Sequence, residues 1–322
     1  MAVYTKLNNK DVLLLSNNYQ IDKVIKFQGI KKGIENTNYL LKTKKKKFIL
    51  TVFEKRVHKK DLPFFMNLMD ELNQKKISCP VPLKNKKGKH LCVIKRKSAC
   101  IVTFLEGKDK AHLDYKNCFD IGKNIAKFHK ATSKISLYRE NSMSINKLSS
   151  LLRSIKFKST EKNQGLKSVL NTNLKNIKRE WPKNIPIGII HGDLFIDNIF
   201  FNKNKFSGFI DFYFSSNDYL MYEIAICINA LCFDKNKKKF FMNNQKVKNL
   251  INGYESIRIF SKKEKNSLNV LCRGAALRYL LTRTYDYFNT PKTALIKIKD
   301  PKEYLQKLII HNKLKNYRDY YN

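Results

Sequence analysis

The chain has 322 residues, with a hydrophobic content of 43% and an aromatic content of 12%, which is enough to bury a large core and excludes a disordered protein. It carries a formal net charge of +39 from 65 basic and 26 acidic residues, and seven cysteines without a CxxC pair. No window approaches eighteen consecutive apolar residues and the N-terminus has no apolar signal core, so the sequence predicts a reduced, cytoplasmic protein.

The positive charge is almost entirely lysine. Only ten of the 65 basic residues are Arg, and Lys recurs with Asn and Ile in nearly every polar segment. These three residues have AT-rich codons, so a biased genome explains the excess without a ligand. Because no RNP-like motif, zinc-finger spacing or helix-turn-helix signature accompanies the charge, we expect no nucleic-acid partner, and no membrane partner either. The sequence leaves the oligomeric state unknown.

The first hundred residues carry strand signals around one predicted helix. Asp61 is the expected N-cap of that helix, with Pro63 in its first turn. The predicted strands are Val24–Gly29, Thr37–Thr43, Phe48–Phe53, His90–Ile94 and Ala99–Leu105. From about residue 115 the pattern is mostly helical. This order predicts an α+β, bilobal, protein-kinase-like fold: a small antiparallel-sheet lobe with one helix at residues 1–106, which binds the nucleotide, and a larger, mainly helical lobe at 107–322, which holds the catalytic and acceptor-binding residues.

A loop for the nucleotide phosphates is expected between the first two strands. Gly29 and Gly33 allow backbone N–H groups to approach phosphate oxygens, and Asn36 ends the loop. Leu105 is expected beside the adenine. Each has a plainer interpretation, since two glycines between strands are typical of a hairpin turn and Leu105 of a core residue. The third strand departs from the kinase pattern, because Thr51 occupies the position of the phosphate-binding Lys.

The segment His191–Asn198, with the sequence HGDLFIDN, carries the strongest functional signal. An Asp and an Asn five residues apart, followed by Asp211 at the end of a later strand, match the spacing of the protein-kinase H-R-D-L-x-x-x-N loop and its metal-binding Asp. Asp193 can accept a hydroxyl proton, while Asn198 and Asp211 offer hard oxygens for Mg²⁺. The sequence therefore predicts a phosphotransferase.

Candidate acceptor-binding residues follow this block. Arg273, Arg278 and Arg283 fall within eleven residues of one predicted helix, in a chain that uses Lys almost everywhere else. A planar guanidinium suits a carboxylate or phosphate, but structural ion pairs with Asp286 or Glu223 explain the arginines equally well. Asp218 is a candidate partner for a substrate ammonium group.

These motifs resemble those of the aminoglycoside/choline phosphotransferase group, and more closely its homoserine kinase branch. The matching blocks are Met1–Thr5, Gly33–Asn38, Leu50–Glu54, Leu62–Phe65, His191–Asn198, Gly208–Phe214, Ala276–Tyr279 and Arg283–Asp286. The resemblance implies ATP-dependent phosphorylation of the L-homoserine hydroxyl to O-phospho-L-homoserine and ADP, a step of threonine biosynthesis. It also implies Asp193 as catalytic base and Asn198 and Asp211 as Mg²⁺ ligands.

Two alternatives remain at this point. A related small-molecule kinase would use another hydroxyl acceptor, such as an aminoglycoside, choline or a sugar. A Lys-rich, non-catalytic binding protein would need neither ATP nor Mg²⁺.

Overall fold

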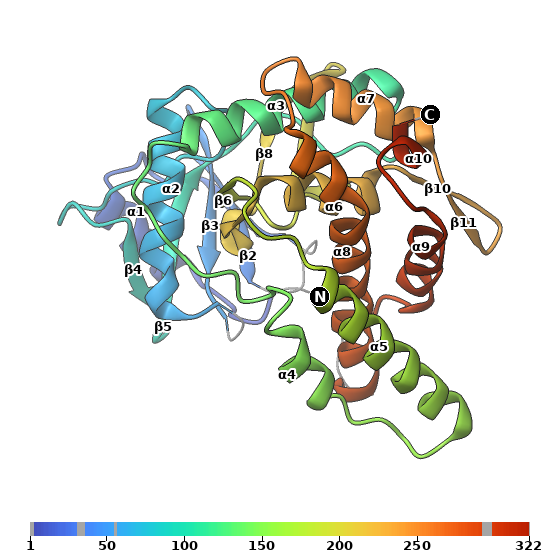
Figure 1. Ribbon diagram of the computed structural model, residues 1–322. Helices are drawn as coiled ribbons and strands as arrows, with labels where there is room; N and C mark the ends of the chain where they lie inside the picture. Colours follow the sequence, from blue (N-terminus) through green and yellow to red (C-terminus); the bar gives the residue numbers. More distant parts are fainter. Residues whose placement is uncertain (1–2, 31–35, 55–56, 292–297, 322) are drawn as a thin grey trace. The chain divides into compact units, whose positions relative to one another are not determined.

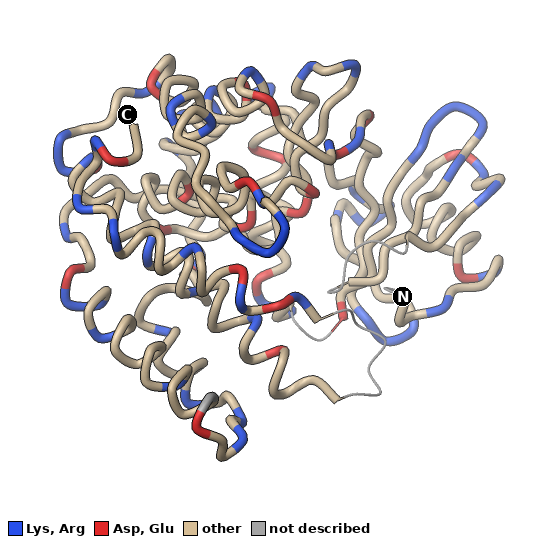
Figure 2. Tube along the Cα trace, turned by 90° about the vertical axis from the view of Figure 1, so that its right-hand side faces the viewer, with Lys and Arg blue, Asp and Glu red and all other residues tan. Residues whose placement is uncertain are grey.

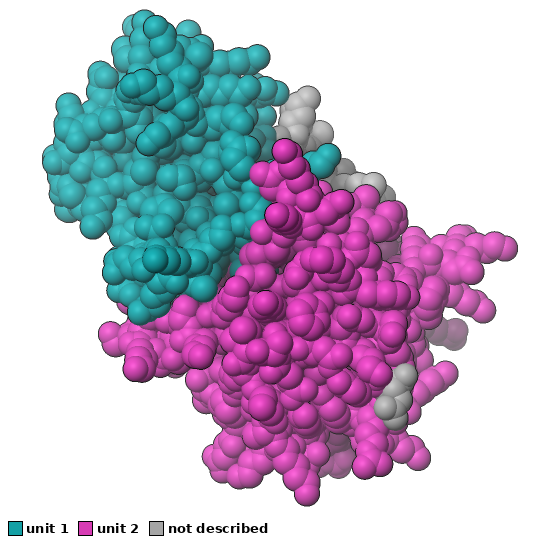
Figure 3. Space-filling model, turned by 90° about the horizontal axis from the view of Figure 1, so that it is seen from above, with its two compact units in different colours: residues 1–108, 207–213 teal, residues 109–206, 214–322 magenta. Residues whose placement is uncertain are grey.

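The computed structural model describes residues 3–30, 36–54, 57–291 and 298–321 (Figure 1). The chain divides into two compact units, one of residues 1–108 with 207–213 and the other of residues 109–206 with 214–322 (Figure 3). The α+β class is confirmed, because the first unit contains an antiparallel sheet and the second is mainly helical. Residues 207–213, here termed the crossing segment, join the first unit although they lie far along the chain. Among the described helices, none combines the length and apolarity that a membrane span requires.

Unit 1 is built on a five-stranded antiparallel sheet with the order β1-β2-β3-β5-β4. Its elements are α1 (Asn9–Tyr19), β1 (Lys26–Gly29), β2 (Thr37–Lys42), β3 (Lys47–Val52), α2 (Leu62–Gln74), β4 (Leu91–Ile94) and β5 (Lys97–Thr103). The five strands were predicted to within three residues at their ends. The sequence predicted one helix here, and the structure has two.

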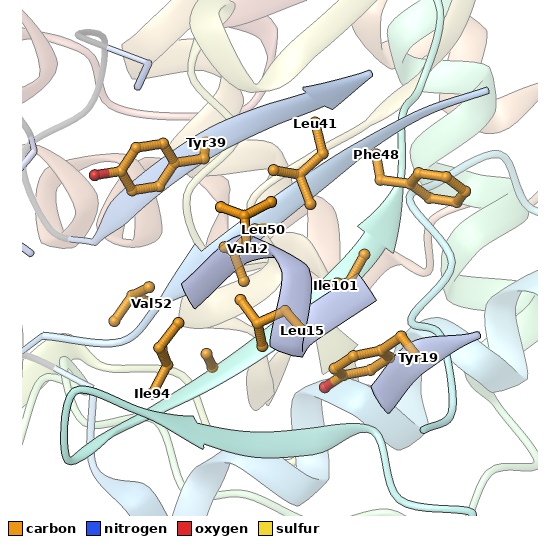
Figure 4. Close-up of a cluster of buried hydrophobic side chains, with 11 residues drawn as sticks. Val12, Leu15, Tyr19, Tyr39, Leu41, Phe48, Leu50, Val52, Ile94 and Ile101 are labelled. Carbon is orange, nitrogen blue, oxygen red and sulfur yellow. The ribbon is translucent and has the colours of Figure 1, made fainter. Parts of the chain in front are cut away.

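Helix α1, the element that the prediction missed, covers one face of the sheet (Figure 4). Val12 and Leu15 pack with Leu41 and Leu50 in a core cluster. A start signal was present in the sequence, because Asn8 and the third residue of the helix form a reciprocal capping box. The helix was overlooked because its exposed side is also partly apolar, which weakens the helical period.

The opposite face of β3 and β5 receives Tyr213 from the crossing segment. Thr51 and Cys100 are partners in the β3–β5 register, and the Cys100 Sγ lies 3.9 Å from the Tyr213 hydroxyl oxygen. The Tyr213 ring makes edge contacts with Phe53 and Phe65, at centroid distances of 5.0 and 5.7 Å. Burial raises the pKa of Tyr213 well above its usual value. The packing of this tyrosine explains why the crossing segment belongs to unit 1.

Unit 2 begins with helices and then contains the predicted catalytic block. Its elements are α3 (Tyr115–Thr132), α4 (Leu148–Arg153), α5 (Glu161–Glu180), β6 (Ile187–Ile190), β7 (Ile199–Asn202), β9 (Ser216–Tyr219), α6 (Leu220–Leu231), β10 (Phe233–Asn236), β11 (Lys239–Met242), α7 (Asn244–Glu255), α8 (Lys262–Asn289), α9 (Lys302–Lys313) and α10 (Arg318–Tyr321). Strand β8 (Lys205–Phe209) leads into the crossing segment. The hairpin of β10 and β11 was not predicted.

Helices α3 and α7 lie unusually close together because glycines face the neighbouring backbone. A Cβ atom at Gly122 would lie 2.0 Å from the Leu250 carbonyl oxygen, and one at Gly253 would lie 2.0 Å from the Phe119 carbonyl oxygen. Any side chain at these positions would therefore push the helices apart.

A buried polar network holds α9 against α6. The Lys307 ammonium donates to the Asn229 carbonyl oxygen at 2.8 Å, and His311 Nε2 lies 3.2 Å from Asn229 Oδ1. The Tyr320 hydroxyl lies 2.9 Å from His311 Nδ1. Burial lowers the pKa of His311 to about 3, so the imidazole is neutral at neutral pH.

We predict that Gly122→Ala lowers the free energy of unfolding by about 2 kcal/mol, because the added methyl group overpacks the α3–α7 contact. Gly165→Ala is the matched control: this helical glycine has nothing within 4 Å of an added Cβ, and alanine favours helix by up to about 1 kcal/mol. Urea unfolding of both variants measures the difference. Equal stability of the two variants would contradict the close helix contact.

Candidate active site

The catalytic loop begins where β6 ends and turns sharply at Gly192. This glycine has φ +78°, and a Cβ there would lie 3.0 Å from the Phe214 carbonyl oxygen. Both observations explain why Gly stands where protein kinases have Arg. The loop then enters a short 3₁₀ helix, Ile196–Asn198, before β7.

A buried carboxylate fixes the start of this loop. Glu223 on α6 has no exposed surface and accepts hydrogen bonds from the backbone N–H groups of His191 and, at 3.1 Å, Gly192. His129 Nε2 lies 4.0 Å from the same carboxylate, and its Nδ1 lies 2.9 Å from the Tyr254 hydroxyl. Burial lowers the pKa of His129 although Glu223 opposes the shift. Glu223 therefore braces the loop.

Asp193 and Asn198 meet within the loop. The Asn198 side-chain nitrogen donates to the Asp193 carbonyl oxygen at 2.8 Å and lies 3.4 Å from Asp193 Oδ2. This hydrogen bond directs the Asn198 Oδ1, a hard ligand atom, away from Asp193. The Asp193 N–H donates to His191 Nδ1 at 3.3 Å, so His191 supports the loop.

Tyr279 on α8 is a contact of Asp193 that the sequence did not reveal. Its hydroxyl lies 3.4 Å from both Asp193 Oδ1 and the Gly192 carbonyl oxygen. The sequence placed Tyr279 on the apolar face of its helix, and nothing in that pattern distinguishes a phenol that reaches a carboxylate from one that only packs.

Asp211 lies in unit 1, two residues beyond the end of β8, in the left-handed region with φ +65°. The sequence placed Asp211 at the end of a strand, but the strand ends at Phe209 and Phe212–Phe214 forms a 3₁₀ turn. A non-glycine residue in this backbone region is strained, as functional residues often are. In the described part of the chain, no three His, Cys, Asp or Glu side chains gather as metal ligands.

Arg278 on α8 is almost fully buried, with 3% of its surface exposed. Its Nε and Nη1 atoms have no hydrogen-bond partner among the described residues. Burial acts to lower its pKa, but the neighbouring Tyr279, Tyr222 and Asp193 outweigh burial and hold the pKa above its usual value. A buried cation with two unused donor atoms is prepared to bind an anion.

Asp218 on β9 lies near this arginine. It accepts hydrogen bonds from Asn141 Nδ2 at 2.6 Å and from the Tyr219 N–H at 2.7 Å. Burial raises its pKa, while Asn141, Tyr219 and Arg278 oppose the shift.

The other two arginines are already engaged. Arg273 forms an ion pair with Glu180 of α5. Arg283 pairs with Glu303 of α9 at 2.6 Å and donates to the Asp300 carbonyl oxygen at 3.1 Å. Both arginines therefore form structural ion pairs, as the sequence allowed. Their partners are Glu180 and Glu303, whereas the sequence suggested Asp286 or Glu223.

The residues predicted for the nucleotide all belong to the first unit. A Cβ at Gly29 would lie 2.7 Å from Val3, which is a packing reason for glycine. The Asn36 Oδ1 accepts from the Glu54 N–H at 3.3 Å. Leu105 is half-buried, and Gly33 lies outside the described residues. Their contacts with a nucleotide stay predictions.

Thr51 occupies the third-strand position expected for Lys. It is buried and donates a hydrogen bond to Asn38 Oδ1 at 2.8 Å. The position thus has a structural role in this protein. Lys55, four residues farther along the chain, lies outside the described residues.

Lysine and arginine are spread over the helices and loops of both units (Figure 2). They are not confined to any one element, as the sequence pattern indicated.

Comparison with known proteins identifies a family. Residues 26–258 match the profile of the phosphotransferase enzyme family. A homoserine kinase of Allorhizobium ampelinum is 40% identical over 320 residues, which cover 99% of each chain. A homoserine kinase of Agrobacterium fabrum is also 40% identical, over 99% of this chain and 98% of its own.

Solved structures show the fold. An amicoumacin kinase in complex with AMP-PNP, Ca²⁺ and amicoumacin superposes with a TM-score of 0.74 at 14% identity, over 97% of each chain. An ethanolamine kinase of Plasmodium vivax gives a TM-score of 0.65 at 18% identity, over 99% of this chain and 94% of its own. The predicted protein-kinase-like fold is confirmed.

We predict that Glu223→Gln lowers the free energy of unfolding by about 1.5–3 kcal/mol, because the amide has one acceptor oxygen where the carboxylate has two and places an NH₂ group opposite a backbone N–H. Amide hydrogen exchange at His191 and Gly192 should accelerate. Glu180→Gln removes a charge whose side chain is 40% exposed and should change stability by less than about 1 kcal/mol. Unchanged exchange in Glu223→Gln would show that the loop is held by other contacts.

Proposed function

The chain belongs to the phosphotransferase enzyme family, and we propose that it transfers the γ-phosphoryl group of ATP to the side-chain hydroxyl of L-homoserine. The products are O-phospho-L-homoserine and ADP, in a step of threonine biosynthesis. The observation that carries this proposal is the 40% identity to homoserine kinases over 99% of the chain. The loop geometry of Asp193 and Asn198 supports the same chemistry.

Asp193 is the proposed catalytic base. The acceptor oxygen attacks the γ-phosphorus, the bond to the β–γ bridging oxygen breaks, ADP leaves, and the hydroxyl proton passes to Asp193. Phosphoryl transfer depends more on positioning than on base strength. Asn198 and Tyr279 supply the positioning, because their side chains approach the two carboxylate oxygens from different elements.

Asn198 and Asp211 are the proposed Mg²⁺ ligands. The donor chemistry fits, since both offer hard oxygens and the Asn198 nitrogen is committed to Asp193. A Mg²⁺ that also binds nucleotide phosphates needs only one or two protein ligands, so the lack of a three-carboxylate cluster among the described residues is compatible with it. When bound, the ion neutralises charge on the phosphates. Gly29, Gly33, Asn36 and Leu105 are proposed to contact the nucleotide.

Arg278 is the proposed anchor for the amino-acid carboxylate, and Asp218 is proposed to bind the ammonium group. The unused Nε and Nη1 atoms of Arg278 carry charged N–H donors that a carboxylate can accept. Arg273 and Arg283 have carboxylate partners of their own, so the proposal places the substrate carboxylate on Arg278. A buried cation at this point disfavours the cationic acceptors of related kinases.

An ADP-release assay with Mg-ATP and a panel of acceptors tests the function. The panel is homoserine, serine, threonine, choline, an aminoglycoside and no acceptor. We expect activity with homoserine, and a loss of at least about 10²-fold in Asp193→Asn. Asp197→Asn, which removes a charge from the same loop, should lose less than about 10-fold. Activity with another acceptor alone would refute the substrate, and full activity of Asp193→Asn would refute the assigned base.

We also predict that Arg278→Lys raises the KM for homoserine by at least about 10-fold while the KM for ATP stays constant. An ammonium group cannot reproduce the planar pair of donors. Steady-state kinetics with each substrate varied in turn measures both values. An unchanged KM for homoserine would return Arg278 to a structural role.

A further inference from the structure

Tyr304 on α9 is a buried phenol with an unused hydroxyl. The residue has no exposed surface, and its hydroxyl oxygen has no hydrogen-bond partner among the described residues. A buried hydroxyl that lacks a partner is unfavourable. Such a group needs an explanation, and a ligand that supplies the missing partner is one.

The ring of Tyr304 is held from three sides. Its centroid lies 5.1 Å from that of Tyr279, the residue that contacts Asp193. The Arg283 guanidinium lies 4.4 Å from the ring centroid and the Lys307 ammonium 4.6 Å. Both cations pair with Glu303, the residue before Tyr304. Arg283, first considered a substrate residue, thus positions this tyrosine.

Tyr304 lies close to the residues proposed for catalysis and acceptor binding. The Arg278 guanidinium lies 4.9 Å from the centroid of the Tyr279 ring, so Tyr304 and Arg278 contact the same ring. Burial is the largest cause of the raised pKa of Tyr304, and the charges of Arg283, Glu303, Asp193 and Arg278 act on it as well. The Tyr304 hydroxyl and the Nε and Nη1 atoms of Arg278 are thus donors within one cluster, all buried and all without a partner among the described residues.

We propose that the Tyr304 hydroxyl donates a hydrogen bond to the α-carboxylate of the acceptor, which the Arg278 guanidinium binds at the same time. This inference rests on the proposed function. A carboxylate has two oxygens with about four acceptor positions, so it can satisfy the phenol and the planar guanidinium together. An acceptor without a carboxylate would leave the three donors unsatisfied.

The proposal makes α9 part of the acceptor site. Residue 304 lies beyond residues 26–258, the part that matches the profile shared by the phosphotransferase family. The buried bonds of Lys307 and His311 to Asn229 hold the helix in place. In addition to Arg278 on α8 and Asp218 on β9, the acceptor site thereby includes a residue of a C-terminal helix outside the segment with the phosphotransfer residues.

The test compares Tyr304→Phe with the unaltered full-length chain on two acceptors. One is L-homoserine, and the other is 3-aminopropan-1-ol, which has hydrogen in place of the carboxylate. We expect the kcat/KM for homoserine to fall by at least about 10-fold, chiefly through KM, because a hydrogen bond to a charged group is lost. The kcat/KM for aminopropanol and the KM for ATP should stay within about twofold. If turnover of aminopropanol is too slow, calorimetric binding constants for the two acceptors give the same ratio.

Tyr317→Phe is the matched control. Its hydroxyl is also buried without a partner among the described residues, but its ring lies 5.8 Å from that of Tyr321 and 5.3 Å from the Lys265 ammonium. This variant should keep the selectivity of the unaltered chain.

Three outcomes are decisive. A selectivity change confined to Tyr304→Phe supports the proposal. An equal loss with both acceptors, or no loss with either, overturns it while leaving the proposed function intact. If the unaltered chain has no activity with homoserine and does not bind it, the proposed function itself fails. Thermal melting of each variant confirms that the fold is retained, and Tyr304→Leu replaces Tyr304→Phe if it is not.

Discussion

The geometry of the catalytic loop depends on one buried carboxylate. The Glu223 carboxyl group has no access to water, so its oxygens must receive hydrogen bonds from the protein, and two come from consecutive loop amides. Because the rigid helix α6 carries Glu223, those two amides are fixed relative to the core of unit 2. The turn at Gly192 and the contacts between Asp193 and Asn198 follow from that fixed start.

A second set of charges, buried at Arg278 and Lys307 and half-buried at Arg283 and Glu303, lies on helices α8 and α9. Arg278 remains cationic without exposure because Asp193 and two tyrosines compensate for its desolvation. Farther along, Glu303 pairs with Arg283 and Lys307, so α9 is attached to α8 through charge as well as packing. Although the whole chain has a net charge of +39, the sign and placement of a charge affect the local structure chiefly at these few positions.

The sequence predicted those parts of the molecule whose structure depends on the spacing of neighbouring residues. Strand alternation located the sheet of unit 1, and the spacing of Asp193 and Asn198 located the loop that the structure brings together. The sequence did not reveal α1, because the outward side chains of this helix are partly apolar. It also did not reveal the partners of Arg273 and Arg283, because these partners belong to other helices. Contacts between segments far apart, such as Tyr279 with Asp193, leave no periodic trace in a sequence.

The route of the chain has a consequence for how the protein is made. The sheet of unit 1 is complete at Thr103, but Tyr213, which packs against its second face, is translated about 110 residues later. At ribosomal rates of about 5–20 residues per second, the nascent sheet waits on the order of 5–20 s for Tyr213, whose hydroxyl lies 3.9 Å from the Cys100 Sγ. During synthesis this face therefore lacks one of its packing partners, and a fragment that stops at the first unit boundary would lack Tyr213 permanently.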